Sequence, residues 1–170
     1  MNKNVMKSAA FVLAASAIFF STGCGGEAGS SMATPKKKIS IAVEASYAPF
    51  EYKDENSHII GFDVDLMKAV AQKMDAEAEF NNLPFEQIFH FVGDKKIQLG
   101  ISAIGATEER KKHVSFSDPY YSLGSYVIVV RPGTEGIHGP TDLKGKIVAA
   151  ERGSTNEVKA KELSPARTVL

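Results

Sequence analysis

Hydrophobic and polar positions follow two different periods in the part of the chain that begins at residue 39. Apolar residues at positions 39, 41 and 43 alternate with polar or small residues, which predicts a strand that ends at Glu44. A loop over residues 45–56 follows. From Asp63, which can serve as an N-cap, the period becomes that of an amphipathic helix, with apolar residues at Leu66, Met67, Val70, Ala71 and Met74.

The alternation of strand and helix continues to residue 102. Residues 78–81 predict a second strand, residues 85–92 an amphipathic helix that ends at Gly93, and residues 97–102 a third strand. Strands and helices that alternate at such short spacing predict an α/β fold with a parallel sheet covered by helices. Ligands bind such sheets beyond the carboxyl ends of the strands, which is where four features fall: Glu44, Tyr47, Phe85 and the segment 102–110.

The pattern is less regular after residue 124. Residues 125–130 form a β-branched run that predicts a long strand, which leaves the α/β part formed by the preceding residues. A helical turn over residues 141–145 and a strand over residues 146–150 follow. Gly153, Ser154 and Thr155 lead into a helix that runs to about Leu163, and residues 167–170 begin a further strand.

The first residues have the pattern of a targeting signal. Two lysines precede an uncharged, almost wholly apolar run over residues 9–20, which is shorter than the roughly 20 residues that span a bilayer. Cys24, the single cysteine, resembles the acylated cysteine of a bacterial lipoprotein signal, although Ser21 stands where that signal usually has Leu. Ordinary signal cleavage beside an incidental cysteine is the alternative. Residues 25–38 are poor in large apolar groups and predict a flexible tether.

Charge and composition exclude several classes of function. The formal net charge is zero, and the basic runs at 36–38 and 110–112 are too short to indicate a nucleic-acid-binding surface. The four histidines are scattered without metal-ligand spacing, so we expect no metal site and no cofactor. A catalytic Ser-His-Asp or Cys-His set is not indicated by any motif, and we expect a binding protein and not an enzyme.

The segment S-A-I-G-A-T-E-E-R-K-K-H-V-S-F-S-D-P-Y-Y, residues 102–121, carries the strongest functional signal. It places Arg110 in the first turn after a strand and a loop of small residues. Free amide groups at a helix start carry partial positive charge, and a guanidinium group offers a planar fork of donors matched to two oxygens. This combination suits a carboxylate. From spacing alone, Arg110 could equally be a solvated member of a basic run with Lys111 and Lys112.

Four motifs together resemble the polar amino-acid-binding branch of the bacterial extracellular solute-binding proteins, family 3, which serve ABC importers. They are G-F-D-V-D-L-M-K-A-V-A-Q-K-M at 61–74, T-E-E-R-K-K-H-V-S-F-S-D-P-Y-Y at 107–121, D-L-K-G-K-I-V-A at 142–149 and R-G-S-T-N-E at 152–157. The resemblance covers residues 39–170. It implies a type II periplasmic-binding-protein-like fold, in which two α/β lobes joined by hinge strands close on one free amino acid.

The resemblance also implies roles for particular residues. Tyr47 and Phe85 would flank the ligand side chain as aromatic walls, each with a core position as the alternative. Arg110 would hold the α-carboxylate. The remaining expected contacts are acidic, polar or backbone groups: Glu44, Ser102, Ala103, Gly105 and Thr155. Two residues depart from the family pattern, because Gly105 stands where Ser or Thr is usual and Gln98 where Asp is usual. The acidic residue that holds the α-ammonium group in the family would lie after Leu170.

These expectations combine into one domain plan. Residues 1–23 would be a lipoprotein signal peptide, 24–38 a tether, 39–125 the first lobe, 126–133 a hinge strand and 134–170 an incomplete second lobe. The protein would be a monomer on the cell surface or in the periplasm, anchored to the membrane through a lipid on Cys24. It would deliver a polar L-amino acid, with a cationic or amide side chain, to the membrane permease of an importer. We expect the 170 residues alone to bind weakly or not at all.

Two alternative functions remain open at this point. The same fold includes prephenate and arogenate dehydratases, for which Glu44 could serve as the catalytic acid. It also includes sensor domains of membrane receptors. A third possibility is a truncated fragment without function.

Overall fold

The computed structural model describes residues 35–122, 124–165 and 168–169 of the 170-residue chain. The predicted signal peptide, Cys24 and all of the tether up to residue 34 lie outside the described residues.

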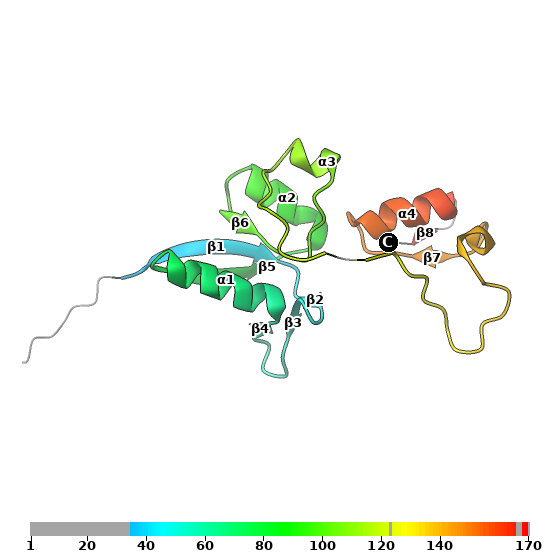
Figure 1. Cartoon of the computed structure of the whole chain (residues 1–170), viewed down its shortest axis with the longest axis horizontal. Coiled ribbons are helices and arrows are strands. Elements are labelled where there is room, and N and C mark those ends of the chain that lie inside the picture. Colours follow the sequence, from blue (N-terminus) through cyan, green and yellow to red (C-terminus); the bar gives the residue numbers. More distant parts are fainter. Residues whose placement is uncertain (1–34, 123, 166–167, 170) are drawn as a thin grey trace, which may run out of the picture. The chain divides into compact units, whose positions relative to one another are not determined.

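The principal sheet has three parallel strands in the order β5-β1-β6 (Figure 1). Strand β1 (Lys37–Val43) is central, with β5 (Ala76–Asn82) on one side and β6 (Leu99–Gly100) on the other. The expected parallel sheet is therefore confirmed, although β1 and β5 begin two residues earlier than expected and β6 is reduced to two residues. Because all three strands run the same way, the segments that follow their carboxyl ends lie at one edge of the sheet.

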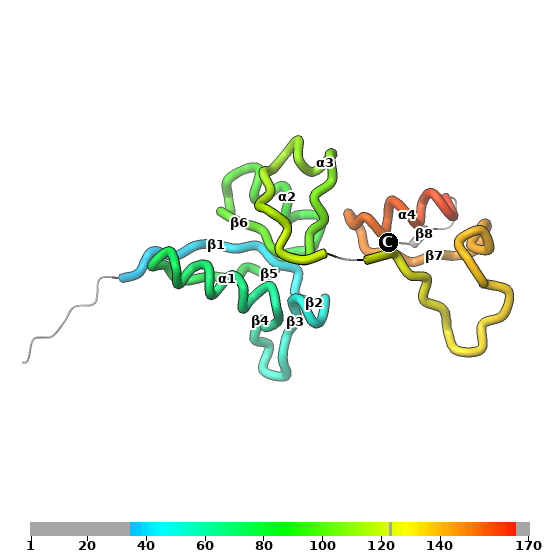
Figure 2. Tube along the Cα trace, viewed as in Figure 1, coloured from blue at the N-terminus to red at the C-terminus, as the bar shows by residue number. Residues whose placement is uncertain are grey.

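Two helices cover opposite faces of this sheet, as the tube view shows (Figure 2). Helix α1 (Phe62–Lys73) packs Met67 and Ala71 on Ile39 and Ile41 of β1. Helix α2 (Phe85–Gly93) packs instead on Ala42, through a cluster that includes Phe85, Ile88 and Ile97. Neighbouring residues of a strand point to opposite faces, so β1 serves both helices and has a buried residue at every position from 41 to 43.

Helix α1 begins differently from the prediction. Asp63 is not the N-cap but the second residue of the helix, and it is completely buried. The capping position is Gly61, where the backbone has a φ of 127°. A side chain there would place its Cβ 2.3 Å from the carbonyl oxygen of Phe50, so both the conformation and the space require glycine.

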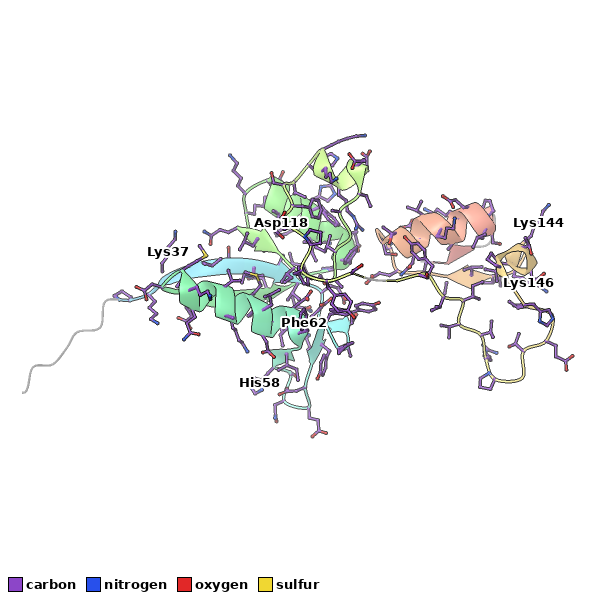
Figure 3. All side chains as sticks on the ribbon, in the orientation of Figure 1. Lys37, His58, Phe62, Asp118, Lys144 and Lys146 are labelled. Atoms are coloured by element: carbon purple, nitrogen blue, oxygen red, sulfur yellow. The ribbon has the colours of Figure 1, made fainter. Side chains whose placement is uncertain are left out.

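The predicted loop over residues 45–56 is wrong in part, because it contains strands. Strands β2 (Ser46–Tyr47), β3 (Glu51–Lys53) and β4 (Ile59–Ile60) form an antiparallel sheet in the order β2-β3-β4. Asp54 stabilises the turn between β3 and β4, since its side chain accepts hydrogen bonds from the backbone N–H groups of Asn56 and His58. Figure 3 shows His58 at this turn and Phe62 where α1 begins.

The strand expected at residues 125–130 is absent, since no strand is described between β6 and β7 (Val148–Ala149). The segment has the right composition, but Val127 is 80% and Val129 87% exposed, and no neighbouring strand in the described part of the chain pairs with it. A β-branched sequence forms a strand only where another strand supplies backbone hydrogen bonds.

The last described part forms a small β–α–β unit. A 3₁₀ helix η1 (Pro140–Leu143) leads to β7, and helix α4 (Thr155–Leu163) connects β7 to the parallel strand β8 (Thr168–Val169). These match the expected elements, with shorter strands. Within the described residues, no helix is long and apolar enough to cross a membrane.

Candidate functional site

The site is built around the segments that follow β1 and β6. Glu44 comes directly after β1, and its backbone N–H donates a hydrogen bond of 3.1 Å to the Ser102 hydroxyl just after β6. Ala103 has a positive φ of 44°, which turns the chain away from the sheet, and its N–H donates to the carboxylate of Asp63 at 2.8 Å. The structure thus brings the predicted residues Glu44, Ser102 and Ala103 together at the carboxyl edge of the sheet.

The two predicted aromatic walls have different surroundings. Tyr47 is 50% exposed and lies parallel to Phe50, with 5.8 Å between ring centres. Phe85 is only 8% exposed, because it packs in the core cluster under α2 and edge-on against Phe89. Tyr47 therefore has an exposed aromatic face, whereas Phe85 is mainly part of the core against which other side chains pack.

Arg110 is held by helix α3 (Glu108–Lys111). The Thr107 hydroxyl caps this helix by accepting a hydrogen bond from the Arg110 backbone N–H. The guanidinium group lies 4.6 Å from the ring centre of Phe89 and 5.3 Å from that of Phe85, so its position is fixed by two cation–π contacts. Its Nη1 and Nη2 groups donate to the carbonyl oxygens of Gly105 and Gly153 at 2.8 and 3.0 Å.

The charge of Arg110 has no carboxylate partner in the described part of the chain, where the ion pairs involve lysines and histidines instead. Both carbonyl groups that it contacts are neutral. Partial burial lowers the pKa of Arg110 from its ordinary value, which means that the surroundings do not compensate fully for lost water. Guanidinium has five N–H donors, so donors remain for a further acceptor.

Gly105 contacts Arg110 directly. Its carbonyl oxygen accepts a hydrogen bond from Arg110 Nη1, while its backbone N–H stays an expected contact to the ligand. A Cβ at this position would meet only Arg110 Nη1, at an ordinary 3.9 Å. The site would therefore accept the Ser or Thr that the family usually has here. Gln98, the other departure, links β1 to the start of β6, because its side-chain oxygen accepts from the Ser40 N–H at 2.9 Å.

Thr155 is the first residue of α4, and Ser154 is its N-cap, since the Ser154 hydroxyl accepts a hydrogen bond from Glu157 N–H at 3.1 Å. Thr155 is therefore not itself the cap. An open hollow of about 560 Å³ includes Thr155 and Arg110 in its lining. Glu44, Tyr47, Phe85, Ser102 and Ala103 do not line that hollow.

Two acidic side chains act on a third near this site. Burial raises the pKa of Glu151, and the negative charges of Glu44 and Glu86 raise it further. Glu44 itself accepts a hydrogen bond of 2.7 Å from the Ser46 hydroxyl. Negative charge therefore gathers around Glu151, and Glu86 lines the same hollow as Arg110.

Three residues at the site were missed by the sequence reasoning. Phe89 lies within the amphipathic helix expected over residues 85–92, and its spacing of four residues from Phe85 is the signal for the two rings that contact Arg110. Glu51 and Asp63 form a buried acidic pair beneath Ser102 and Ala103. The sequence holds no local signal for this pair, because burial of Glu51 depends on residues far along the chain.

The sequence pattern that defines the bacterial extracellular solute-binding proteins, family 3, matches residues 39–164. The chain belongs to this family. Its fold also agrees with solved structures of amino-acid-binding proteins. An ancestral arginine-binding protein bound to arginine matches 76% of the chain and 57% of its own length, with 41% identity and a TM-score of 0.72. The expected type II periplasmic-binding-protein-like α/β fold is thereby confirmed.

Two further similarities bear on function. The arginine-binding extracellular protein ArtP of Bacillus subtilis is 40% identical over 160 residues, which is 94% of this chain. An ancestral amino-acid-binding protein described as a precursor of cyclohexadienyl dehydratase shares 35% identity, covers 78% of the chain and has a TM-score of 0.71. The chain spans 62% of the length of the Bacillus protein and 60% of that of the ancestral one.

Proposed function

We propose that this solute-binding protein captures a free L-amino acid with a cationic side chain, with arginine as the preferred ligand, and delivers it to the permease of an ABC importer. One observation supports the proposal most directly: the half-buried guanidinium group of Arg110 lies over an aromatic ring and has no carboxylate partner among the described residues. Such a group gains most from an anion that arrives with a ligand.

The α-carboxylate of an amino acid fits Arg110 in charge and shape. Its two oxygens match the planar fork of the guanidinium group, and the contact would be charge-assisted in a site partly shielded from water. The Ser102 hydroxyl and the Ala103 N–H bond to Glu51 and Asp63 and so shape the edge of the sheet. Thr155, at the start of α4, supplies a polar contact of the kind that orients a small ligand. Tyr47 supplies an exposed aromatic face for the aliphatic part of the side chain.

The acidic residues favour a positively charged side chain. Besides its burial, the negative charges of Glu44 and Glu86 raise the pKa of Glu151, and a cation placed near Glu151 would relieve that repulsion. A neutral amide would gain hydrogen bonds but would not neutralise the charge. The name of the Bacillus relative, an arginine-binding protein, agrees with this order of preference.

A titration of the isotope-labelled chain, followed by NMR, tests the proposal. Arginine should shift the backbone resonances of residues 44, 102, 103 and 110, with a dissociation constant on the order of 1 mM because one lobe supplies most of the contacts. Lysine, histidine and glutamine should bind more weakly. Tighter binding of glutamate or leucine than of arginine would contradict the proposal. Lys111→Ala serves as the control, since Lys111 is already paired with Glu108.

The same proposal includes attachment to the membrane and a monomeric state. Cys24 carries the lipid after cleavage at Gly23, and the tether over residues 24–38 keeps the binding lobes near the permease at the cell surface or in the periplasm. Mass spectrometry of the N-terminal peptide from membranes should find a diacylglycerol-modified Cys24. Unmodified Cys24, or release of the protein into the medium to the same extent as Cys24→Ser, would refute the anchor.

The domain plan and the absence of catalysis belong to the proposal as well. Residues 39–125 would form the first lobe, 126–133 the hinge and 134–170 part of the second lobe, so limited proteolysis should cut first between residues 126 and 133. Prephenate and arogenate should remain unchanged after long incubation with the protein. Turnover that disappears in Glu44→Gln would instead identify a dehydratase.

A further inference from the structure

Two carboxyl groups lie buried side by side beneath the binding edge. Glu51 of β3 is 1% exposed and Asp63 of α1 is fully buried. They come from different elements, and their side chains are in direct contact. Neither forms an ion pair with a lysine, arginine or histidine of the described residues. Two buried negative charges without a cation would be very costly.

Hydrogen bonds satisfy two of the four carboxyl oxygens. Glu51 Oε1 accepts from the Ser102 hydroxyl at 2.8 Å. Asp63 Oδ2 accepts from the Ala103 backbone N–H and from the Tyr120 hydroxyl, each at 2.8 Å. The remaining oxygens, Glu51 Oε2 and Asp63 Oδ1, are both buried and have no hydrogen-bond partner.

One proton shared between Glu51 Oε2 and Asp63 Oδ1 would give both oxygens a hydrogen-bond partner. When Glu51 Oε2 carries a proton, it becomes a hydrogen-bond donor. Asp63 Oδ1 is a buried acceptor that lacks such a donor. The pair then carries a single negative charge, which is stabilised by the two donors on Asp63 Oδ2. We propose that Glu51 and Asp63 share one proton and act as positioning residues, which hold Ser102 and Ala103 in the geometry that the ligand requires.

The groups that face the pair support this protonation state. Besides each other, the titratable side chains that act on the pair are Glu44 and Tyr120. Burial raises the pKa of Glu51 to about 8; the hydrogen bond from Ser102 opposes the rise, while the negative charges of Asp63 and Glu44 add to it. Burial, followed by the bond to Asp63, also raises the pKa of Tyr120, so its hydroxyl remains a donor.

The position of the pair gives it a role in binding, and this step rests on the proposed function. The Ser102 hydroxyl accepts a hydrogen bond from the Glu44 N–H and donates one to Glu51. It therefore links the segments that follow β1 and β6. Ala103 has a positive φ that its bond to Asp63 helps to hold. Tyr120 ties the segment after α3 to the same carboxylate. A change in the protonation of the pair would therefore disturb three segments around the ligand.

Amide substitutions test the shared proton. In Glu51→Gln the amide N–H₂ replaces the proton, and in Asp63→Asn the amide can donate to an ionised Glu51, so each single variant keeps one donor between the two side chains. In the double variant the amide oxygens are needed as acceptors for Ser102, Ala103 and Tyr120, so the two NH₂ groups take the remaining positions. Two donors then face each other without an acceptor. Glu55→Gln and Asp65→Asn are matched controls, because both acids lie nearby in the chain and are exposed.

Each single variant should bind arginine with an affinity within about threefold of that of the unsubstituted chain. The affinity of the double variant should be at least about tenfold lower than the product of the two single effects predicts. Additive effects of the two substitutions would overturn the proposal. Each control should leave arginine affinity unchanged; a loss there as large as that of the double variant would likewise overturn it.

A second measurement needs neither substitutions nor ligand. In the isotope-labelled chain, the side-chain carboxyl carbon of Glu51 should change its chemical shift with a midpoint near pH 8, and the amide proton of Ala103 should follow with the same midpoint. A Glu51 carboxyl already ionised at pH 6 would overturn the shared proton. Because this titration is independent of arginine, it separates failure of the shared proton from failure of the proposed ligand.

Discussion

The stability of the protein should fall when the pH rises from about 5.5 to 8, because of Glu51. The folded state keeps a proton on this carboxyl up to about pH 8, while the unfolded chain loses it at the ordinary value of 4.5. Between these values the folded state binds one more proton than the unfolded state. The stabilisation is complete below pH 4.5 and is lost as the pH rises to about 8.

The size of the effect follows from the pKa difference. Each pH unit in this interval should lower the free energy of unfolding by about 1.4 kcal/mol, so the 2.5 units above pH 5.5 correspond to at most about 3 kcal/mol. That is a large share of the 5–15 kcal/mol typical of a domain. At an ordinary dependence on urea, the unfolding midpoint should fall by about 1–2 M.

Urea unfolding followed by far-ultraviolet circular dichroism is a suitable assay, because the chain has no tryptophan. Glu51→Gln is the control, since the amide retains the hydrogen bonds and cannot titrate. The variant should unfold at a nearly constant midpoint over this pH range. An unchanged midpoint in the unsubstituted chain, or an equal fall in both proteins, would refute the assignment to Glu51.

Two further predictions concern the fold and the ligand. Gly61→Ala should destabilise the chain by about 3 kcal/mol or more in urea unfolding, because the new Cβ would lie 2.3 Å from a carbonyl oxygen and the φ of 127° is itself unfavourable for alanine. Gly136→Ala, at a φ of 76° and in open space, should cost only about 1 kcal/mol; equal costs would disprove the argument from close approach and backbone conformation. Glu44→Gln should weaken arginine binding about 5- to 30-fold while changing glutamine binding less than threefold, as calorimetry or NMR titration can measure; an equal loss for both ligands would mean that Glu44 does not recognise charge.

The sequence predicted those elements whose formation depends on a long, regular pattern. Strand β1 and helix α1 follow from the apolar periods around Ile41 and Met67, which both enter one core cluster. Short elements were missed for a physical reason. Strands β2 to β4 have two or three residues each, and a period of two cannot be recognised over so few positions.

The error at residues 125–130 has a different origin. The β-branched residues favour a strand, but a strand is completed by the hydrogen bonds of its neighbour, which composition does not report. The same limit applies to the binding edge. Arg110 and Ser102 belong to one continuous motif and could be predicted from it. Glu51 reads as a surface acid, because its partner Ser102 is 51 residues away and only the fold brings the two together.

Arg110, as the group that binds the α-carboxylate, is the residue on which the proposed binding site depends most. Agmatine, which is arginine without that carboxylate, gives the most direct test when both ligands are titrated into the unsubstituted chain and into Arg110→Ala. The chain should prefer arginine by about 30-fold or more, equivalent to roughly 2 kcal/mol or more, and Arg110→Ala should lose this preference while remaining folded. Equal affinity of the unsubstituted chain for both ligands, or an undiminished preference in Arg110→Ala, would contradict the central claim.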